Sequence, residues 1–182
     1  DWLNRSDLTT QIVDFIALAE TRIARELKTT DTQIVTTITI DASSVALPAD
    51  YFGMVFIKTV GSDLIMDYMP PDSLFSRKVA TLTGRPLAYT IMGAKLYFNP
   101  NPDISYTGTI CYIAKPDIAT DTTNSVLTNH PDLYLFGALA EAADFLGDEV
   151  NYSKYNNKFM MALDSANESA DFNGALWMPV DA

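Results

Sequence analysis

Three carboxylates near the end of the chain have a spacing that suits acid–base or metal chemistry. Glu141, Asp144 and Asp148 are separated by three and four residues, so on a helix their side chains lie on one face. Grouped carboxylates of this kind bind Mg²⁺ or Ca²⁺, or act together as general acid and general base. The opposite face of the same segment carries an apolar stripe, which is the ordinary pattern of an amphipathic helix. We therefore expect these carboxylates to form a solvated face.

Nucleophilic and soft-ligand chemistry is restricted by the presence of one histidine and one cysteine. A Ser-His-Asp or Cys-His pair would have to use His130, and a structural zinc site needs several Cys or His residues. His130 precedes Pro131 and Asp132, so we interpret it as part of a helix start rather than as a lone general base. Cys111 lies in an apolar run, which predicts a buried, unreactive thiol. The sequence predicts no enzymatic activity, no metal ion and no cofactor.

Anion-binding loops are also poorly supported. The eight glycines are scattered and form neither the GxGxxG nor the GxxxxGK[ST] pattern. The segment Thr83-Gly84-Arg85-Pro86 could form a small anion-binding turn around its arginine. We favour a plain loop, in which Gly84 supplies a positive φ before an edge strand.

The first element that the chain must fold is a helix. Apolar residues recur at steps of three and four from about Thr9 to Lys28, which predicts an amphipathic helix there. The stripe consists of Ile12, Phe15, Ile16, Ala19, Ile23 and Leu27. We expect Trp2 and Leu3 to belong to a further packed turn before this helix.

From Thr32 onward the sequence has a period of two, with β-branched residues at alternate positions up to Ile40, which is typical of a strand. Further strands are predicted at residues 54–60, 64–69, 87–92, 95–98 and 105–114. The third and fourth of these form a hairpin around Gly93, and residues 70–75 begin a short helix.

After a polar loop at residues 117–129 the helical period returns twice. One stripe ends at Gly147 and the second begins near Tyr155, so the two helices form a hairpin joined near residues 148–151. We expect the N-terminal helix to pack against this hairpin, because none of the three can bury its stripe alone. The side chains expected in their shared core are Leu18, Ile23, Phe136, Leu139, Phe159 and Leu163.

This order of helix, strands and helices indicates an α+β fold rather than a doubly wound sheet. Residues 1–31 and 128–171 are expected to form a helical lobe, with an antiparallel β lobe of residues 32–127 inserted. Residues 172–182 form an apolar C-terminal tail without helical or strand period. A terminus of such content is tied down or binds a partner, and its large apolar residues are Phe172, Leu176, Trp177, Met178 and Val180.

Composition limits the classes of function. The chain has 182 residues, of which 48% are hydrophobic and 19% charged, and no apolar run approaches the roughly 18 residues of a membrane span. We expect a soluble, folded protein that does not bind a membrane. Because the sequence opens at Asp1 without an initiator methionine, we expect preceding residues in the gene product, and nothing points to export.

The charge of the chain is strongly negative. The formal net charge of −11 disfavours sequence-specific binding of DNA or RNA, whose phosphates require the opposite sign. Residues 131–182 contain nine acids and two lysines, which gives −7 of that charge. An acidic helical surface repels DNA, which suits the wall of a channel through which DNA slides. Glu141, Asp144 and Asp148 are our candidates for side chains that face such a channel.

Several segments, in this order, resemble the head-to-tail adaptor proteins of short-tailed and related tailed bacteriophages. The resemblance covers most of the chain, and none of its segments is a catalytic motif. The segments are residues 2–8 (WLNRSDL), 15–23 (FIALAETRI), 47–51 (LPADY), 84–86 (GRP) with 89–91 (YTI), and 131–139 (PDLYLFGAL).

The resemblance implies a structural virion protein without catalytic residues. Members of such a family form a homo-oligomeric ring, here expected to have twelve copies, between the portal protein and the tail nozzle protein. The ring continues the DNA channel during assembly and ejection, so genomic DNA passes through without sequence-specific binding. The implied locations are the neck of the virion and, during assembly, the cytoplasm of the host bacterium. The implied partner of the C-terminal tail is the portal.

Two other functions compete with this one. The first is a small carboxylate-dependent hydrolase that uses acids of the β lobe and of the helix near Glu141. The second is a β-rich carbohydrate-binding or tail-fibre module. Most of the aromatic residues that it would use alternate within the predicted strands, which favours core or sheet-surface positions for them. Its stacking platform would be Tyr51, Phe52, Tyr89, Tyr97, Tyr106 and Tyr112.

Overall fold

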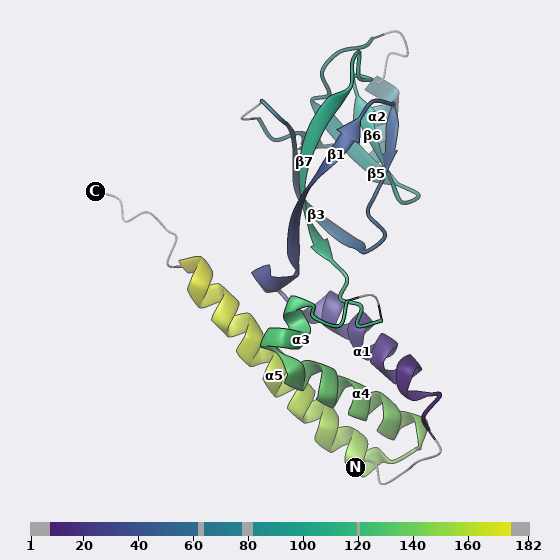
Figure 1. Cartoon of the computed structure of the whole chain (residues 1–182), viewed down its shortest axis with the longest axis vertical. Helices are drawn as coiled ribbons and strands as arrows, with labels where there is room; N and C mark the ends of the chain where they lie inside the picture. The colour runs from purple at the N-terminus through teal and green to yellow at the C-terminus, as the bar shows by residue number, and fades with distance from the viewer. Residues whose placement is uncertain (1–7, 62–63, 78–81, 120, 176–182) are drawn as a thin grey trace, which may run out of the picture. The chain divides into compact units, whose positions relative to one another are not determined.

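The computed structural model describes residues 8–61, 64–77, 82–119 and 121–175 (Figure 1). Contacts within the chain divide it into two compact units. The helical unit consists of Asp1–Thr32 and Lys115–Ala182, and the β unit consists of Gln33–Ala114. The helical unit is therefore built from both ends of the chain, and the predicted α+β fold class is confirmed.

The helical unit is formed by helices whose ends follow from local sequence. It contains α1 (Ile12–Glu26), η1 (Thr30–Thr32), α3 (Ser125–Asn129), α4 (Pro131–Phe145) and α5 (Glu149–Ala175). Pro131 occupies the first turn of α4, where its missing N–H is not needed. Gly147 has a φ of 67°, which only glycine adopts without strain, and it allows the chain to turn from α4 into α5.

The predicted packing of the N-terminal helix against the C-terminal hairpin is confirmed. Ile23 of α1, Leu133 of α4 and Phe159 of α5 are fully buried in one cluster. Gly137 permits the close approach of α4 to α1, because a Cβ at this position would lie 2.9 Å from the Cβ of Ala19.

Most of the predicted helical core is confirmed. Ile23, Leu139, Phe159 and Leu163 are buried, and Phe136 is half-buried. The prediction for Leu18 is wrong, because its side chain is 52% exposed. Leu18 lies on the side of α1 opposite Glu20, and it is the Glu20 side that packs against the rest of the unit.

The β unit contains two sheets and one short helix. A three-stranded antiparallel sheet has the order β1 (Gln33–Ile40), β7 (Tyr106–Ala114) and β3 (Tyr51–Thr59). A four-stranded sheet has the order β2, β6, β5 and β4, in which β4 and β5 are parallel. The bounds of its strands and of the helix are β2 (Ser44–Ala46), β4 (Asp67–Tyr68), α2 (Pro71–Arg77), β5 (Ala88–Met92) and β6 (Lys95–Asn99).

The predicted hairpin around Gly93 is present as β5 and β6. Met92 pairs with Lys95, so the turn has two residues, and both Gly93 and Ala94 have a positive φ as such turns require. Side chains from both sheets form one apolar core, in which Ile57, Phe98 and Ile110 are fully buried.

Some elements differ from those predicted. β2 and α3 were not expected, and β4 has two residues where residues 64–69 had been predicted as a strand. Residues 115–127 belong to the helical unit, although we had assigned them to the β lobe. α5 continues through residues 172–175, so the prediction that helical structure ends before Phe172 is wrong. Extending an existing helix needs no new nucleus, so residues 172–175 can be helical without an apolar stripe of their own.

In the described part of the chain, no helix combines the length and the hydropathy that crossing a bilayer requires.

Candidate functional site

Glu141 has a specific partner within the helical unit. The guanidinium of Arg22 on α1 donates to Glu141 Oε1 at 3.4 Å and to Asn156 Oδ1 on α5 at 2.9 Å. The same guanidinium lies 4.4 Å from the ring centroid of Phe159. The Arg22 and Glu141 side chains are only 17% and 19% exposed. Our expectation of a solvated face is therefore wrong for Glu141, which helps to hold the three long helices together.

Asp148 has a different role, at the start of α5. Its Oδ1 accepts a hydrogen bond from the backbone N–H of Asn151 at 3.0 Å, and its Oδ2 accepts one from the Asn151 side chain at 2.6 Å. These two hydrogen bonds lower the pKa of the Asp148 carboxyl. Asp148 thus caps the N-terminus of α5.

The three carboxylates do not form one site. Glu141 is paired with Arg22, Asp148 caps a helix, and Asp144 is exposed. Over the residues that the structure describes, no group of three or more His, Cys, Asp or Glu side chains is arranged to hold a metal ion. This geometry gives no support to a hydrolase centred on Glu141.

His130 lies between α3 and α4, as its position before Pro131 predicted, but its side chain does not cap α4. Its Nε2 lies 3.3 Å from Asp31 Oδ2, and the Asn129 side chain donates to the same oxygen at 3.0 Å. The hydroxyl of Ser125 donates to the backbone carbonyl of Asp31. His130 is thus part of a polar contact between η1 and α3.

Glu20 on α1 is a buried acid, 5% exposed, that we did not predict from the sequence. Its Oε1 accepts a hydrogen bond from the backbone N–H of Ile118 at 2.6 Å. Burial raises the pKa of the Glu20 carboxyl, and the hydrogen bond from Ile118 partly opposes this shift. Glu20 follows Ile16 by four residues and precedes Ile23 by three, so its place within the apolar stripe was a usable signal.

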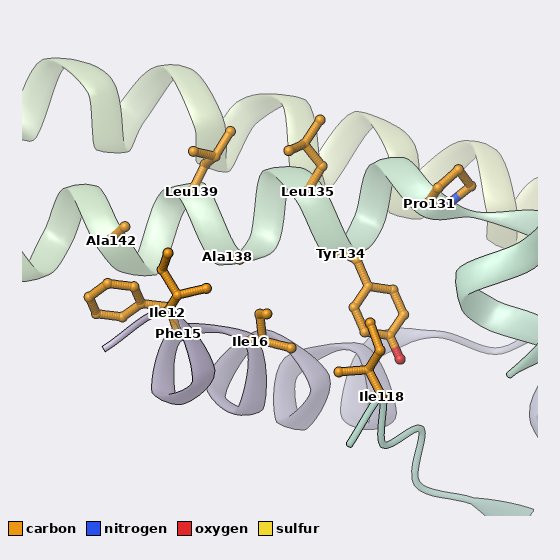
Figure 2. Close-up of a pocket in the computed structure, with 10 residues that line it drawn as sticks. All are labelled: Ile12, Phe15, Ile16, Ile118, Pro131, Tyr134, Leu135, Ala138, Leu139 and Ala142. Atoms are coloured by element: carbon orange, nitrogen blue, oxygen red, sulfur yellow. The ribbon is translucent and has the colours of Figure 1, made fainter. Parts of the chain in front are cut away.

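An apolar groove of about 540 Å³ lies between α1 and α4, and we call it the α1–α4 groove (Figure 2). Ile12, Phe15 and Ala142 lie at one end, and Tyr134 and Ile118 lie at the other. The remaining lining residues are Ile16, Pro131, Leu135, Ala138 and Leu139. This volume falls within the range of roughly 300–1,000 Å³ typical of ligand pockets.

In the β unit, Arg85 does not lie in an open anion-binding turn. Its Nε donates to the hydroxyl of Thr59 at 2.8 Å, and Thr59 is buried. The plain-loop interpretation holds, but Gly84 is not among the glycines with positive φ, so that detail of the prediction is wrong. Cys111 is buried as predicted, and burial raises the pKa of its thiol.

The six aromatic residues proposed as a carbohydrate platform do not lie together on the surface. Tyr89 and Tyr112 are buried in the core of the β unit, and Tyr51 stacks on Tyr112 with ring centroids 6.1 Å apart. The Tyr112 hydroxyl donates to Asp50 at 3.0 Å, and burial together with this carboxylate raises its pKa to about 12. Phe52 is 45% exposed, whereas Tyr97 and Tyr106 are half-buried. The five tyrosines therefore pack against other residues of the β unit, and Phe52 is the exposed member of the set.

The residues predicted to bind a partner through the C-terminal tail are only partly covered by the structure. Phe172 lies in the last turns of α5. Leu176, Trp177, Met178 and Val180 lie outside the described residues.

Comparison with known proteins gives one clear result. A family model described as SU10 adaptor protein matches residues 1–179 of the chain. The match spans both the helical unit and the β unit. No curated protein matches the chain.

Proposed function

Because the chain belongs to the SU10 adaptor protein family, a family of structural bacteriophage proteins, we propose that it forms the adaptor ring between the portal and the tail nozzle. The observation that carries this proposal is the family match over residues 1–179. In this role the protein is a component of the virion neck and is assembled in the cytoplasm of the host bacterium. It performs no catalysis, and twelve copies form the ring.

We propose that the apolar C-terminal tail attaches the protein to the portal. The five large apolar residues after residue 171 are Phe172, Leu176, Trp177, Met178 and Val180. Burying such side chains contributes about 1.5–3 kcal/mol each before ordering costs are subtracted. A portal subunit offers the surface on which this segment is buried.

The channel wall is the second part of the proposal. Residues 131–182 carry nine acids against two lysines, and a negative wall keeps DNA from adhering as it passes. Glu141, Asp144 and Asp148 remain the candidates for this surface. Of the three, Asp144 is the most suitable, because Glu141 is paired with Arg22 and Asp148 caps α5.

The attachment is tested by mixing the purified protein with its cognate portal and counting copies per portal ring by native mass spectrometry. The variant Trp177→Ser, Met178→Ser, Val180→Ser is expected to lose at least tenfold in affinity for portal. The matched control is Val150→Ser, Met161→Ser, because these α5 residues are 80% and 73% exposed and lie outside the proposed segment. Equal affinity of the tail variant and the unaltered protein would overturn the assignment.

A further inference from the structure

The α1–α4 groove is apolar and open. At the end formed by Ile12, Phe15 and Ala142, which we call the near end, it continues into further exposed apolar surface. Ile12 and Leu135, which line it, are 44% and 39% exposed. Phe145, which is 61% exposed, packs on Phe15 with ring centroids 5.5 Å apart. A contiguous apolar surface of this kind normally binds an apolar segment.

The chain has two apolar segments outside the described residues that could occupy this groove. One contains Trp2 and Leu3, before α1, and the other contains Leu176, Trp177 and Met178, after α5. The two segments differ in whether they are long enough to reach the groove, because each is joined to the helical unit at a known residue.

The C-terminal segment begins too far from the groove of its own chain. Asn167 of α5 hydrogen-bonds to the backbone of Glu26 and Lys28, at the end of α1. From there α5 continues for eight residues to Ala175, which adds about 12 Å at a rise of 1.5 Å per residue. Trp177 is two residues further on, a reach of roughly 7 Å. The groove lies beside the first half of α1, so Trp177 cannot return to it.

The N-terminal segment begins beside the groove. Leu8 is buried, and its backbone carbonyl accepts hydrogen bonds from the N–H groups of Gln11 and Ile12 at 3.0 Å. Leu8 thereby lies about one helical turn before Ile12, and Ile12 lies at one end of the groove. Trp2 lies six positions before Leu8, and an extended chain spans up to roughly 21 Å over six residue steps. The near part of the groove is within this distance, because Ile12 and Ile16 are separated by only about 6 Å of helical rise.

We propose that Trp2 and Leu3 of the same chain dock into the α1–α4 groove and cover its apolar lining. A Trp side chain buries about 150–250 Å² of surface, and Leu3 adds a further apolar group. This inference rests on the geometry of the helical unit and does not depend on the adaptor assignment.

The chain contains two tryptophans, one in each candidate segment, so fluorescence tests the proposal directly. Trp177→Phe leaves only Trp2, and Trp2→Phe leaves only Trp177. In the protein that retains Trp2, we expect a blue-shifted emission and acrylamide quenching several-fold weaker than that of free tryptophan. Both properties should be independent of protein concentration, because the docking occurs within one chain.

Ala138→Glu then places a charge in the groove, and Ala17→Glu is the matched control on an exposed position of α1 outside it. Ala138→Glu should red-shift Trp2 emission, increase its quenching and speed tryptic cleavage after Arg5, whereas Ala17→Glu should change none of these. Circular dichroism establishes whether both variants fold. If Ala138→Glu does not fold, the emission of Trp2 in the Trp177→Phe protein with an unaltered groove still tests the proposal.

Three results would overturn the proposal. The first is a solvent-exposed emission of Trp2 in the folded protein. The second is a response of Trp177, instead of Trp2, to Ala138→Glu, which would assign the groove to the C-terminal segment of another copy. The third is a Trp2 signal that appears only as the protein concentration rises, which would assign it to a second copy.

Discussion

In the β unit, β7 exchanges backbone hydrogen bonds with β1 and β3 along most of its length, whereas the long helices of the helical unit satisfy most backbone groups internally. The helices are therefore aligned by side chains from distant parts of the sequence. Arg22 joins α1 to α4 and α5, Glu20 holds Ile118, and Asn167 holds the end of α1. The difference shows that polar substitutions should affect the helical unit most, whereas apolar truncations should affect both units.

The largest expected effects come from emptying either core. Phe159 and Phe98 are fully buried in the helical and β units, and replacing either with alanine costs about 3–5 kcal/mol of unfolding free energy. Since each unit has its own core, hydrogen exchange should accelerate mainly in α1, α4 and α5 for Phe159→Ala. Phe98→Ala should accelerate exchange mainly in β5, β6 and β7. Equal acceleration in both units by either variant would show that they unfold together.

Two glycines, one in each unit, lie in close contact with a neighbouring element. A Cβ at Gly137 would lie 2.9 Å from Ala19 Cβ, an atom fixed to the backbone, so Gly137→Ala forces α1 and α4 apart. We expect a cost of about 1–3 kcal/mol, reduced by a gain in helix propensity of roughly 1 kcal/mol. A Cβ at Gly108 would lie 2.8 Å from Ile40 Cδ1, which can move by a rotamer change, so Gly108→Ala should cost less. Urea unfolding of both variants measures the difference, and a costlier Gly108→Ala contradicts the reasoning.

The aligning role of Arg22 is tested by removing its partner. Glu141→Ala should cost about 1–2 kcal/mol, because a half-buried guanidinium loses a charged hydrogen bond. Asp144→Ala, one turn away and exposed, should change stability by less than about 0.5 kcal/mol. A double-mutant cycle with Arg22→Met isolates the pair. A coupling energy near zero would mean that Arg22 aligns the helices through Asn156 and Phe159 alone.

The smallest expected effect is a pH dependence located at Glu20. Its carboxyl pKa is raised above the ordinary value of 4.5, so the folded state binds the proton more tightly than the unfolded state. This contribution to stability is complete below pH 4.5 and is lost as the pH rises through the raised pKa. Glu20→Gln keeps an acceptor for the Ile118 amide and should remove this loss.

In the β unit, Asp103 gives a pH dependence of the unfolding free energy opposite in sign to that of Glu20. A hydrogen bond from the Tyr106 hydroxyl lowers the pKa of Asp103, so its contribution is present at neutral pH and is lost on acidification. We would measure unfolding free energies across the acidic pH range for the unaltered protein, for Glu20→Gln and for Asp103→Asn. These measurements separate the contribution of Glu20 from that of Asp103. An unchanged pH profile in Glu20→Gln would contradict the assignment to Glu20.

The fold was predictable where a periodic pattern is long. The stripe of α1 and the alternation of β1 each identified an element, because burial of one face imposes its period on the sequence. The hairpin turn was identified by Gly93, which has a positive φ. Short elements carry too few residues for a period. α3, which has five residues, depends on Asn124, whose side chain accepts the Leu127 N–H.

The polar contacts were harder to predict, because they join residues far apart in the sequence. Glu141 was taken for a solvated residue, since its partner Arg22 lies 119 positions away. Asp148 was grouped with it by helical spacing, although the chain turns at Gly147 and Asp148 begins a new helix. The separation of these carboxylates into unrelated roles needed the tertiary structure.

The proposed adaptor ring is tested most directly by native mass spectrometry of the cognate portal after incubation with the purified protein. We expect a complex that contains one ring of twelve copies per portal ring. Electron microscopy of the same sample should show this ring on one end of the portal, around a continuous channel. Portal rings whose mass is unchanged at saturating protein would show that the protein is not the portal's adaptor.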